Sequence, residues 1–183
     1  MGASGAGASG LTNHHDRIQS QKYAIDIVKF GDNGKLFKKE GVANEDSYTF
    51  GAEIISPVNG IVVHLIDSLP DRKITDRDKL AGNHIIIEFQ DSLFIALAHL
   101  KQHSISVKLG DTVEIGEKLA QVGNSGNTDF PHLHVHIQNS ETYDIDTTTT
   151  YPIRFREFRR MRYGFWTNQN NQFLLSNDII KPK

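Results

Sequence analysis

The run of alternating histidines HLHVHI at residues 132–137 restricts the possible folds of this chain more than any other feature. Successive side chains of a β-strand point to opposite faces. As a strand, this segment places three imidazoles on one face and three aliphatic side chains on the other, where they can join a core. Imidazole is the commonest protein metal ligand, so such a face suits a metal site. The alternative is a half-exposed strand that carries histidines by chance, because the chain has nine of them.

Composition narrows the chemistry that is open to such a site. The 183 residues are enough for one domain, or for one domain with an extension, and for a buried core. The chain has no cysteine, which excludes disulfides and thiolate zinc sites. Any metal must therefore bind histidine nitrogen and carboxylate oxygen. A formal charge of −2 gives no sign of nucleic-acid or membrane-surface binding, and no apolar run is long enough to span a bilayer.

Residues 1–10, MGASGAGASG, have the Gly/Ala/Ser composition of a linker or tag remnant. We leave them out of the fold and expect a single domain over residues 11–183. Period-2 alternation and turn dipeptides predict strands near residues 23–30, 53–65, 83–89, 93–99 and 132–138. Two strands are expected within 53–65, on either side of the tight-turn dipeptide Asn59-Gly60.

Helical periodicity is nearly absent before residue 150. We therefore predict an all-β fold, mainly an antiparallel sheet with a sandwich-like or barrel-like core. An irregular C-terminal extension is expected from about residue 140. Within it, residues 154–163 carry five arginines against one glutamate. We expect Phe155 and Phe158 to pack this segment over the β-core, with the guanidinium groups in solvent.

Other polar residues extend the histidine strand into a candidate catalytic site. Asp26 lies in an apolar strand-like run, where a carboxylate costs stability unless it is paired or bound. His14 and His15 precede it, and His99 ends another apolar strand. A catalytic zinc takes three ligands from histidine and carboxylate and leaves one position for water. One of His14 and His15, Asp26 and one histidine of the strand would form such a set. The remaining histidines could orient the water or stabilise a tetrahedral intermediate.

Two motifs resemble those of a known family. Gly123-Asn124-Ser125-Gly126 and Pro131-His132-Leu133-His134 together resemble the GN[ST]G…PHLH signature of lysostaphin/LytM-type zinc metallopeptidases, peptidase family M23. The turn at residues 57–60, Ala98-His99-Leu100 and residues 107–119 are similar in type and order to that family's core. The resemblance covers residues 12–160.

Residue by residue, the resemblance implies a Zn²⁺ ion held by His15, Asp26 and His134. It implies that His99 and His132 are the catalytic residues.

The first ligand departs from the common pattern. Most members have a histidine four residues before the aspartate, where this chain has Lys22. The sequence of residues 21–26 is similar to that of a subgroup in which the histidine lies farther upstream. His15-Asp16-Arg17 fits the upstream element of that subgroup. His14 stays open as the alternative to His15. His136 occupies a position where the family often has Glu or Gln, and we expect a supporting or exposed role for it.

The resemblance implies a zinc metalloendopeptidase that hydrolyses peptide bonds, in bacterial peptidoglycan, by metal-activated water. It implies a location in the bacterial cell envelope or outside the cell, with an export signal or anchor removed upstream. One alternative is a non-catalytic relative that binds cell-wall peptides or regulates a partner enzyme, which Lys22 favours. The other is a biotinyl/lipoyl-like or sugar-phosphotransfer carrier, because the turns at residues 57–62 and 110–119 are similar to those of that architecture.

Overall fold

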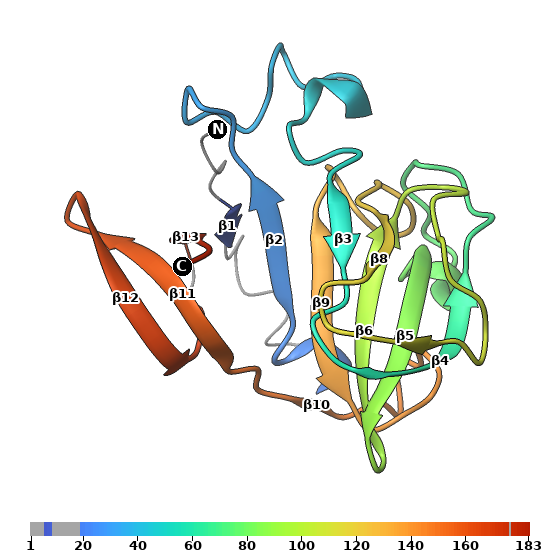
Figure 1. Ribbon diagram of the computed structural model, residues 1–183. Coiled ribbons are helices and arrows are strands. Elements are labelled where there is room, and N and C mark those ends of the chain that lie inside the picture. The colour runs from blue at the N-terminus through green and yellow to red at the C-terminus, as the bar shows by residue number, and fades with distance from the viewer. Residues whose placement is uncertain (1–5, 9–18, 176) are drawn as a thin grey trace.

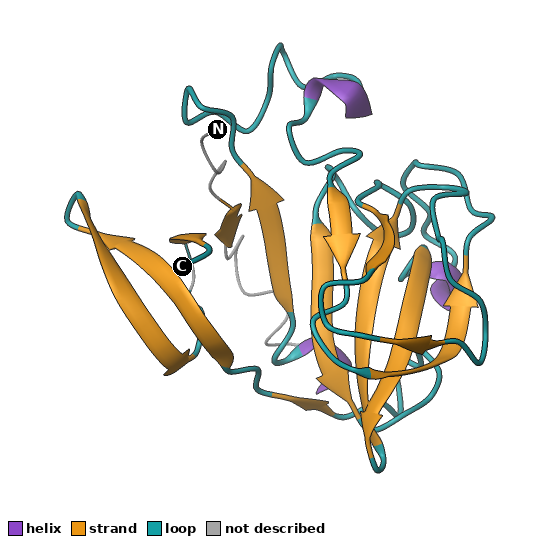
Figure 2. Cartoon of the chain, in the orientation of Figure 1, coloured by secondary structure: helices purple, strands orange, loops and turns teal. Residues whose placement is uncertain are grey.

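The chain folds mainly into β-strands, as a computed structural model shows for residues 6–8, 19–175 and 177–183 (Figures 1 and 2). The strands are β1 (Ala6–Ala8), β2 (Ile25–Lys29), β3 (Glu53–Ile55), β4 (Gly60–Ile66), β5 (Asn83–Gln90), β6 (Leu93–Leu100), β7 (Thr112–Val113), β8 (Lys118–Gln121), β9 (Leu133–Gln138), β10 (Thr150–Tyr151), β11 (Phe155–Arg162), β12 (Phe165–Gln172) and β13 (Asp178–Lys181). The helices of the described residues are single 3₁₀ turns: η2 (Gln19–Gln21), η3 (Asn44–Asp46) and η4 (Arg77–Lys79). None of them is long and apolar enough to cross a membrane.

Eleven strands form one antiparallel sheet, in the order β12-β11-β13-β1-β2-β9-β6-β5-β4-β7, with β10 beside β9. A second sheet pairs β3 with β8. Figure 1 shows this small sheet in front of β9 and β6, so the domain has two layers. The predicted all-β, mainly antiparallel fold is confirmed.

The two faces of the central strands differ in character. On one face, Ile85, Leu97 and Val135 join the main hydrophobic core, to which the small sheet contributes Ile54 and Leu119. Burying each such side chain is worth about 1.5–3 kcal/mol. This burial also fixes the register, since a slip of one residue would move the core side chains to the opposite face. The opposite face of β9 is thereby reserved for its histidines.

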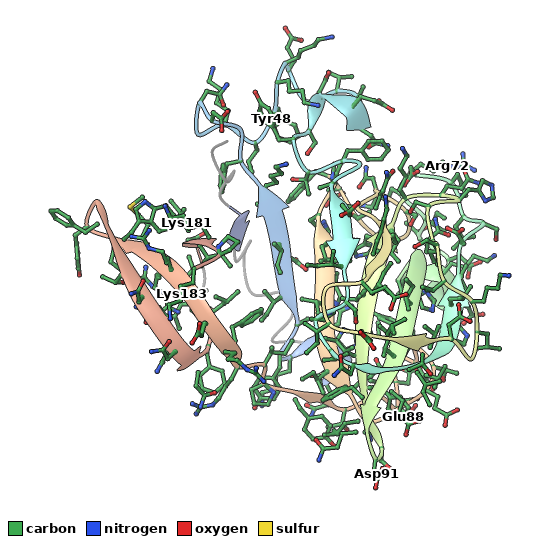
Figure 3. The ribbon with its side chains drawn as sticks, viewed as in Figure 1. Tyr48, Arg72, Glu88, Asp91, Lys181 and Lys183 are labelled. Atoms are coloured by element: carbon green, nitrogen blue, oxygen red, sulfur yellow. The ribbon has the colours of Figure 1, made fainter. Side chains whose placement is uncertain are left out.

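The hairpin of β5 and β6 matches the sequence prediction closely. Its two-residue connection, Asp91-Ser92, lies at the lower tip of the molecule in Figure 3. Ser92 has a φ of 60°, the left-handed conformation that tight hairpin turns require.

The segment at residues 53–65 contains the two expected strands, but they do not pair with each other. β3 pairs with β8, whereas β4 pairs with β5 and β7. Gly60 is needed for close packing, because a Cβ there would lie 2.2 Å from the carbonyl oxygen of Glu88 on β5.

Two expectations about the chain ends differ from the structure. The C-terminal region is not irregular, because β11, β12 and β13 pair in regular antiparallel register. The Gly/Ala/Ser segment that we left out of the fold contributes β1, which pairs with β2 and β13. Glycine and alanine present little side chain, so this composition does not prevent strand pairing.

The arginines of β11 are not all in solvent, which corrects the expectation for residues 154–163. The Asp178 carboxylate, fully buried, accepts from Arg160 at 2.8 Å and from Arg162 at 2.5 Å. The Arg159 guanidinium and the Lys181 ammonium both lie over the Trp166 ring. Figure 3 labels Lys181 on this part of the sheet, and the ribbon of β11 and β12 stands beside the core rather than over it. Long-range ion pairs therefore order an extension in which alternating apolar side chains are scarce.

Candidate metal centre

Adjacent strands bring together four of the predicted site residues. β9 lies between β2 and β6. In register, His134 of β9 lies opposite Asp26 of β2 on one side and Ala98 of β6 on the other. Directly opposed residues share a face of the sheet, with Cβ atoms about 4.5–5.5 Å apart. The small alanine leaves room for imidazole rings over the sheet.

The Asp26 carboxylate faces two imidazoles. Its Oδ1 lies 3.0 Å from Nδ1 of His134 and 3.6 Å from Nε2 of His132. His134 is 2% exposed and His132 is 8% exposed. Two ligands bound to one tetrahedral zinc at about 2.0–2.2 Å lie about 3.3 Å apart. The Asp26–His134 approach is therefore close to what a shared metal ion needs.

His99 is the second-last residue of β6 and has a backbone conformation that is uncommon for residues other than glycine. Its φ is 60°, in the left-handed region. The backbone is held on both sides: its N–H donates to the Ala81 carbonyl at 3.0 Å, and its carbonyl accepts from Gly123 at 2.9 Å. Strained residues of this kind cost about 1–3 kcal/mol and gather at functional sites. The two hydrogen bonds hold His99 in this conformation and so fix where its imidazole lies.

Both His99 and His132 have a defined tautomer. The Nδ1 of His99 lies 2.8 Å from the Ser125 carbonyl oxygen, and the Nδ1 of His132 lies 2.9 Å from that of Phe130. A carbonyl oxygen only accepts, so each Nδ1 carries the hydrogen and each Nε2 keeps a lone pair. Burial, and then the neighbouring His132 and His134, hold the pKa of His99 well below 6.5. His99 is thus a neutral imidazole near pH 7.

The Gly-Asn-Ser-Gly loop at residues 123–126 holds His99 in position through Ser125. Ser125 is fully buried, and its Oγ accepts from the Asn83 N–H while it donates to the Leu100 carbonyl. Its own carbonyl is then aimed at His99. Gly82 has a φ of 63°, and a Cβ there would lie 2.2 Å from that carbonyl oxygen. The loop and the start of β5 can pack this closely only because Gly82 has no side chain.

The same loop supports His132 through Thr128. The Thr128 hydroxyl lies 3.2 Å from Nδ1 of His132, 2.8 Å from the Phe130 carbonyl and 3.1 Å from Oδ1 of Asn124. Asn124 is in turn held by Asn44, at 2.7 Å. The motif therefore positions both of the histidines that we predicted to be catalytic.

Among the described residues, one group of at least three metal-ligating side chains has its ligand atoms within 4.8 Å of one another, and it consists of His99, His132 and His134. Asp26 adjoins this group through the two contacts given above. His15, predicted as the first ligand, and its alternative His14 lie outside the described residues.

The family profile for peptidase family M23 matches residues 41–146, which is more than half of the chain. The chain belongs to peptidase family M23. The carrier hypothesis is set aside, because the matched segment includes the turns on which it rested.

The individual proteins to which the chain is similar share only 19–32% of their residues with it over the matched segments. An uncharacterized metalloprotease of Buchnera aphidicola subsp. Baizongia pistaciae is 32% identical over 87 residues, which cover 48% of this chain and 20% of that protein. The catalytic domain of lysostaphin, an antimicrobial peptidase from Staphylococcus simulans, is 20% identical with a TM-score of 0.47, covering 80% of this chain and 84% of that one. A zinc-containing peptidase from Vibrio cholerae is 19% identical with a TM-score of 0.38, covering 62% of this chain and 46% of that one.

The M23 match contains His99, His132 and His134 but begins after Asp26. The place of Asp26 in the site is therefore supported by strand pairing and by its distance from His134. Two residues of this M23 domain that the motifs do not single out, His136 and Gln138, are fully buried behind His134. The period-2 pattern of β9 was the available signal, since it places both on the face of His134.

Proposed function

We propose that this chain is a zinc metalloendopeptidase domain that hydrolyses peptide bonds in bacterial peptidoglycan. The observation that carries the proposal is the approach of Asp26 to His134 beside His99 and His132. Family membership supports a metallopeptidase, and the substrate class comes from the resemblance of the sequence motifs to the lysostaphin/LytM-type enzymes. The same resemblance supports a site of action in the bacterial cell envelope or outside the cell.

The residues of the site fit a zinc ion. Carboxylate oxygen and imidazole nitrogen are its usual ligands, and the chain has no thiolate to compete. Asp26 and His134 would hold the ion, with His15 as the proposed third ligand. Zinc, when bound, lowers the pKa of a coordinated water and polarises the carbonyl to be attacked.

His99 and His132 would do the proton chemistry. Each has its Nδ1–H committed to a backbone carbonyl, so Nε2 is the atom left to accept a proton from the attacking water. Their ring centroids are 4.7 Å apart, so the pair can serve both the water and the carbonyl oxygen of one peptide bond. After protonation, Nε2–H can donate to the oxyanion or to the leaving amine. The depressed pKa of His99 keeps it ready as an acceptor.

A non-catalytic role is favoured by one observation, the presence of Lys22 where most of the lysostaphin/LytM-type motifs have histidine. In that case the domain would bind cell-wall peptides, or regulate a partner enzyme, without turnover.

The test is cleavage of purified peptidoglycan by the zinc-loaded chain, measured as release of new amino groups, with the cleaved bond identified by mass spectrometry. The proposal expects turnover that a chelator abolishes and zinc restores. It also expects Asp26→Ala and His134→Ala to lose zinc. Binding to peptidoglycan without any new amino groups would support the non-catalytic alternative and contradict the peptidase.

A further inference from the structure

A buried polar chain runs along β9 away from the site. His134, His136 and Gln138 lie on one face of the strand, and they are 2%, 0% and 0% exposed. Buried polar groups are costly unless each finds a hydrogen-bond partner. Here each member contacts the next: Nε2 of His134 lies 3.1 Å from Nδ1 of His136, and Nε2 of His136 lies 2.6 Å from Oε1 of Gln138.

The direction of this chain is set at its far end. The side-chain amide of Gln138 donates to the Ser140 carbonyl at 2.6 Å and to the Thr142 carbonyl at 3.1 Å. Both acceptors are carbonyl oxygens, so the amide nitrogen must face them. Oε1 of Gln138 is thereby turned to His136, and because an amide oxygen only accepts, Nε2 of His136 must carry a hydrogen.

The hydrogen positions on both imidazoles follow from this assignment. A neutral imidazole carries one N–H, so Nδ1 of His136 keeps a lone pair and accepts from Nε2 of His134. His134 then has its hydrogen on Nε2 and a lone pair on Nδ1, the atom that lies 3.0 Å from Oδ1 of Asp26. Two acceptors face each other there, and a cation between them makes the contact favourable.

Tyr143 covers part of this row of polar side chains on β9. Its ring lies against His136 with the centroids 5.5 Å apart, and its hydroxyl accepts from Nε2 of Gln21 at 3.2 Å. Burial raises the pKa of Tyr143, so it stays neutral and adds no competing charge.

We propose that His136 and Gln138 are positioning residues that fix the tautomer of His134, so that Nδ1 and not Nε2 binds the metal. The proposal rests on the proposed function in one respect, that Asp26 and His134 hold a metal ion. Partners that hold the second nitrogen of a ligating histidine typically contribute about 10–100-fold in metal affinity. They orient the ring and remove the competing tautomer.

The first test needs no variant. The chain, with ¹⁵N-labelled histidine, is loaded with ¹¹³Cd²⁺, and coupling between cadmium and each histidine nitrogen is recorded by NMR. The proposal expects coupling to Nδ1 of His134 and a hydrogen on its Nε2. Coupling to Nε2 of His134 would overturn the proposed role of His136 and Gln138 while leaving the metal site in place. Absence of any coupling to His134 would overturn the proposed metal site itself.

The second test measures zinc affinity by competition with a chromophoric chelator. His136→Leu and Gln138→Leu are expected to weaken binding about 10–100-fold. His136→Gln is expected to bind within a few-fold of the wild type, because its amide oxygen can accept from Nε2 of His134. His84→Leu, which removes another buried imidazole, serves as the matched control and should leave affinity unchanged. Wild-type affinity in His136→Leu, or a loss in His136→Gln or in His84→Leu as large as the loss in His136→Leu, would reject the positioning role.

Discussion

Acid is expected to destabilise this fold through a histidine that lies outside the proposed catalytic residues. His84 on β5 is 4% exposed. Its Nδ1–H donates to the Gly82 carbonyl at 2.8 Å, and its Nε2 accepts from Nδ1 of His64 at 3.1 Å. Burial lowers the pKa of His84 from 6.5 to about 4, with a smaller lowering from His64, against the raising effect of the Gly82 carbonyl.

The sign of the effect follows from proton binding. The folded protein keeps His84 neutral, whereas the unfolded chain protonates it with a pKa of about 6.5. Below pH 6.5 the unfolded state therefore binds more protons, so the stability that neutral His84 contributes is present above that pH and lost as the pH falls towards 4. These two pKa values give a loss of about 2 kcal/mol in the free energy of unfolding between pH 8 and pH 5.

Urea unfolding at pH 8 and pH 5, with a chelator present so that no metal contributes, measures this loss. The comparison variant is His84→Gln, because its side-chain amide can still donate to the Gly82 carbonyl but does not titrate. The wild type should lose about 2 kcal/mol more than His84→Gln over this interval. His103→Gln, at an exposed histidine, should behave as the wild type does. Equal losses in the wild type and in His84→Gln would refute the reasoning.

Three further outcomes are expected. His99→Asn, chosen because asparagine tolerates the left-handed backbone, and His132→Ala should each lower turnover about 10²–10⁴-fold while zinc content stays at the wild-type level. Gly82→Ala should lower turnover at least tenfold and reduce stability in urea, because its Cβ would meet the carbonyl that holds His99 at 2.2 Å. Asp178→Ala should cost about 3 kcal/mol in the free energy of unfolding, because it leaves the charge of Arg160 buried without its carboxylate.

Three of these four variants have a matched control. His103→Asn repeats the substitution at a left-handed but exposed histidine and should keep full turnover. Gly51→Ala places a Cβ at a glycine of φ 76° with no atom within 4 Å, so it reports backbone strain alone. Glu157→Ala removes a half-exposed ion pair with Lys183 and should change stability by less than about 1 kcal/mol. If a control lost as much turnover or stability as its test variant, the role given to the contact that the test variant removes would be contradicted.

The sequence predicted the central strands because their alternation reports one buried face. It also predicted that Asp26, His99, His132 and His134 would act together, since the motifs name them, and the structure places them side by side. Strand pairing was harder to foresee. Nothing near Asn59-Gly60 shows that β3 pairs with β8, because that choice depends on a segment sixty residues away.

The C-terminal extension was misread for a related reason. Its order depends on Asp178, a single buried carboxylate that binds two arginines of β11. Local patterning cannot show which distant acid will neutralise an arginine. The roles of Ser125 and Gln138 were also hidden, since they act through a carbonyl and an amide whose partners are known only once the loops are folded.

We propose that Asp26 and His134 share one zinc ion while His99 and His132 carry out proton transfer. Anomalous X-ray scattering at the zinc edge, on crystals of the zinc-loaded chain, tests this directly. We expect one zinc per chain within about 2.0–2.2 Å of an Asp26 oxygen and of Nδ1 of His134, and beyond bonding distance of His99. A zinc ion bound to His99, His132 and His134 without Asp26 would contradict it, as would the absence of any zinc peak at this site.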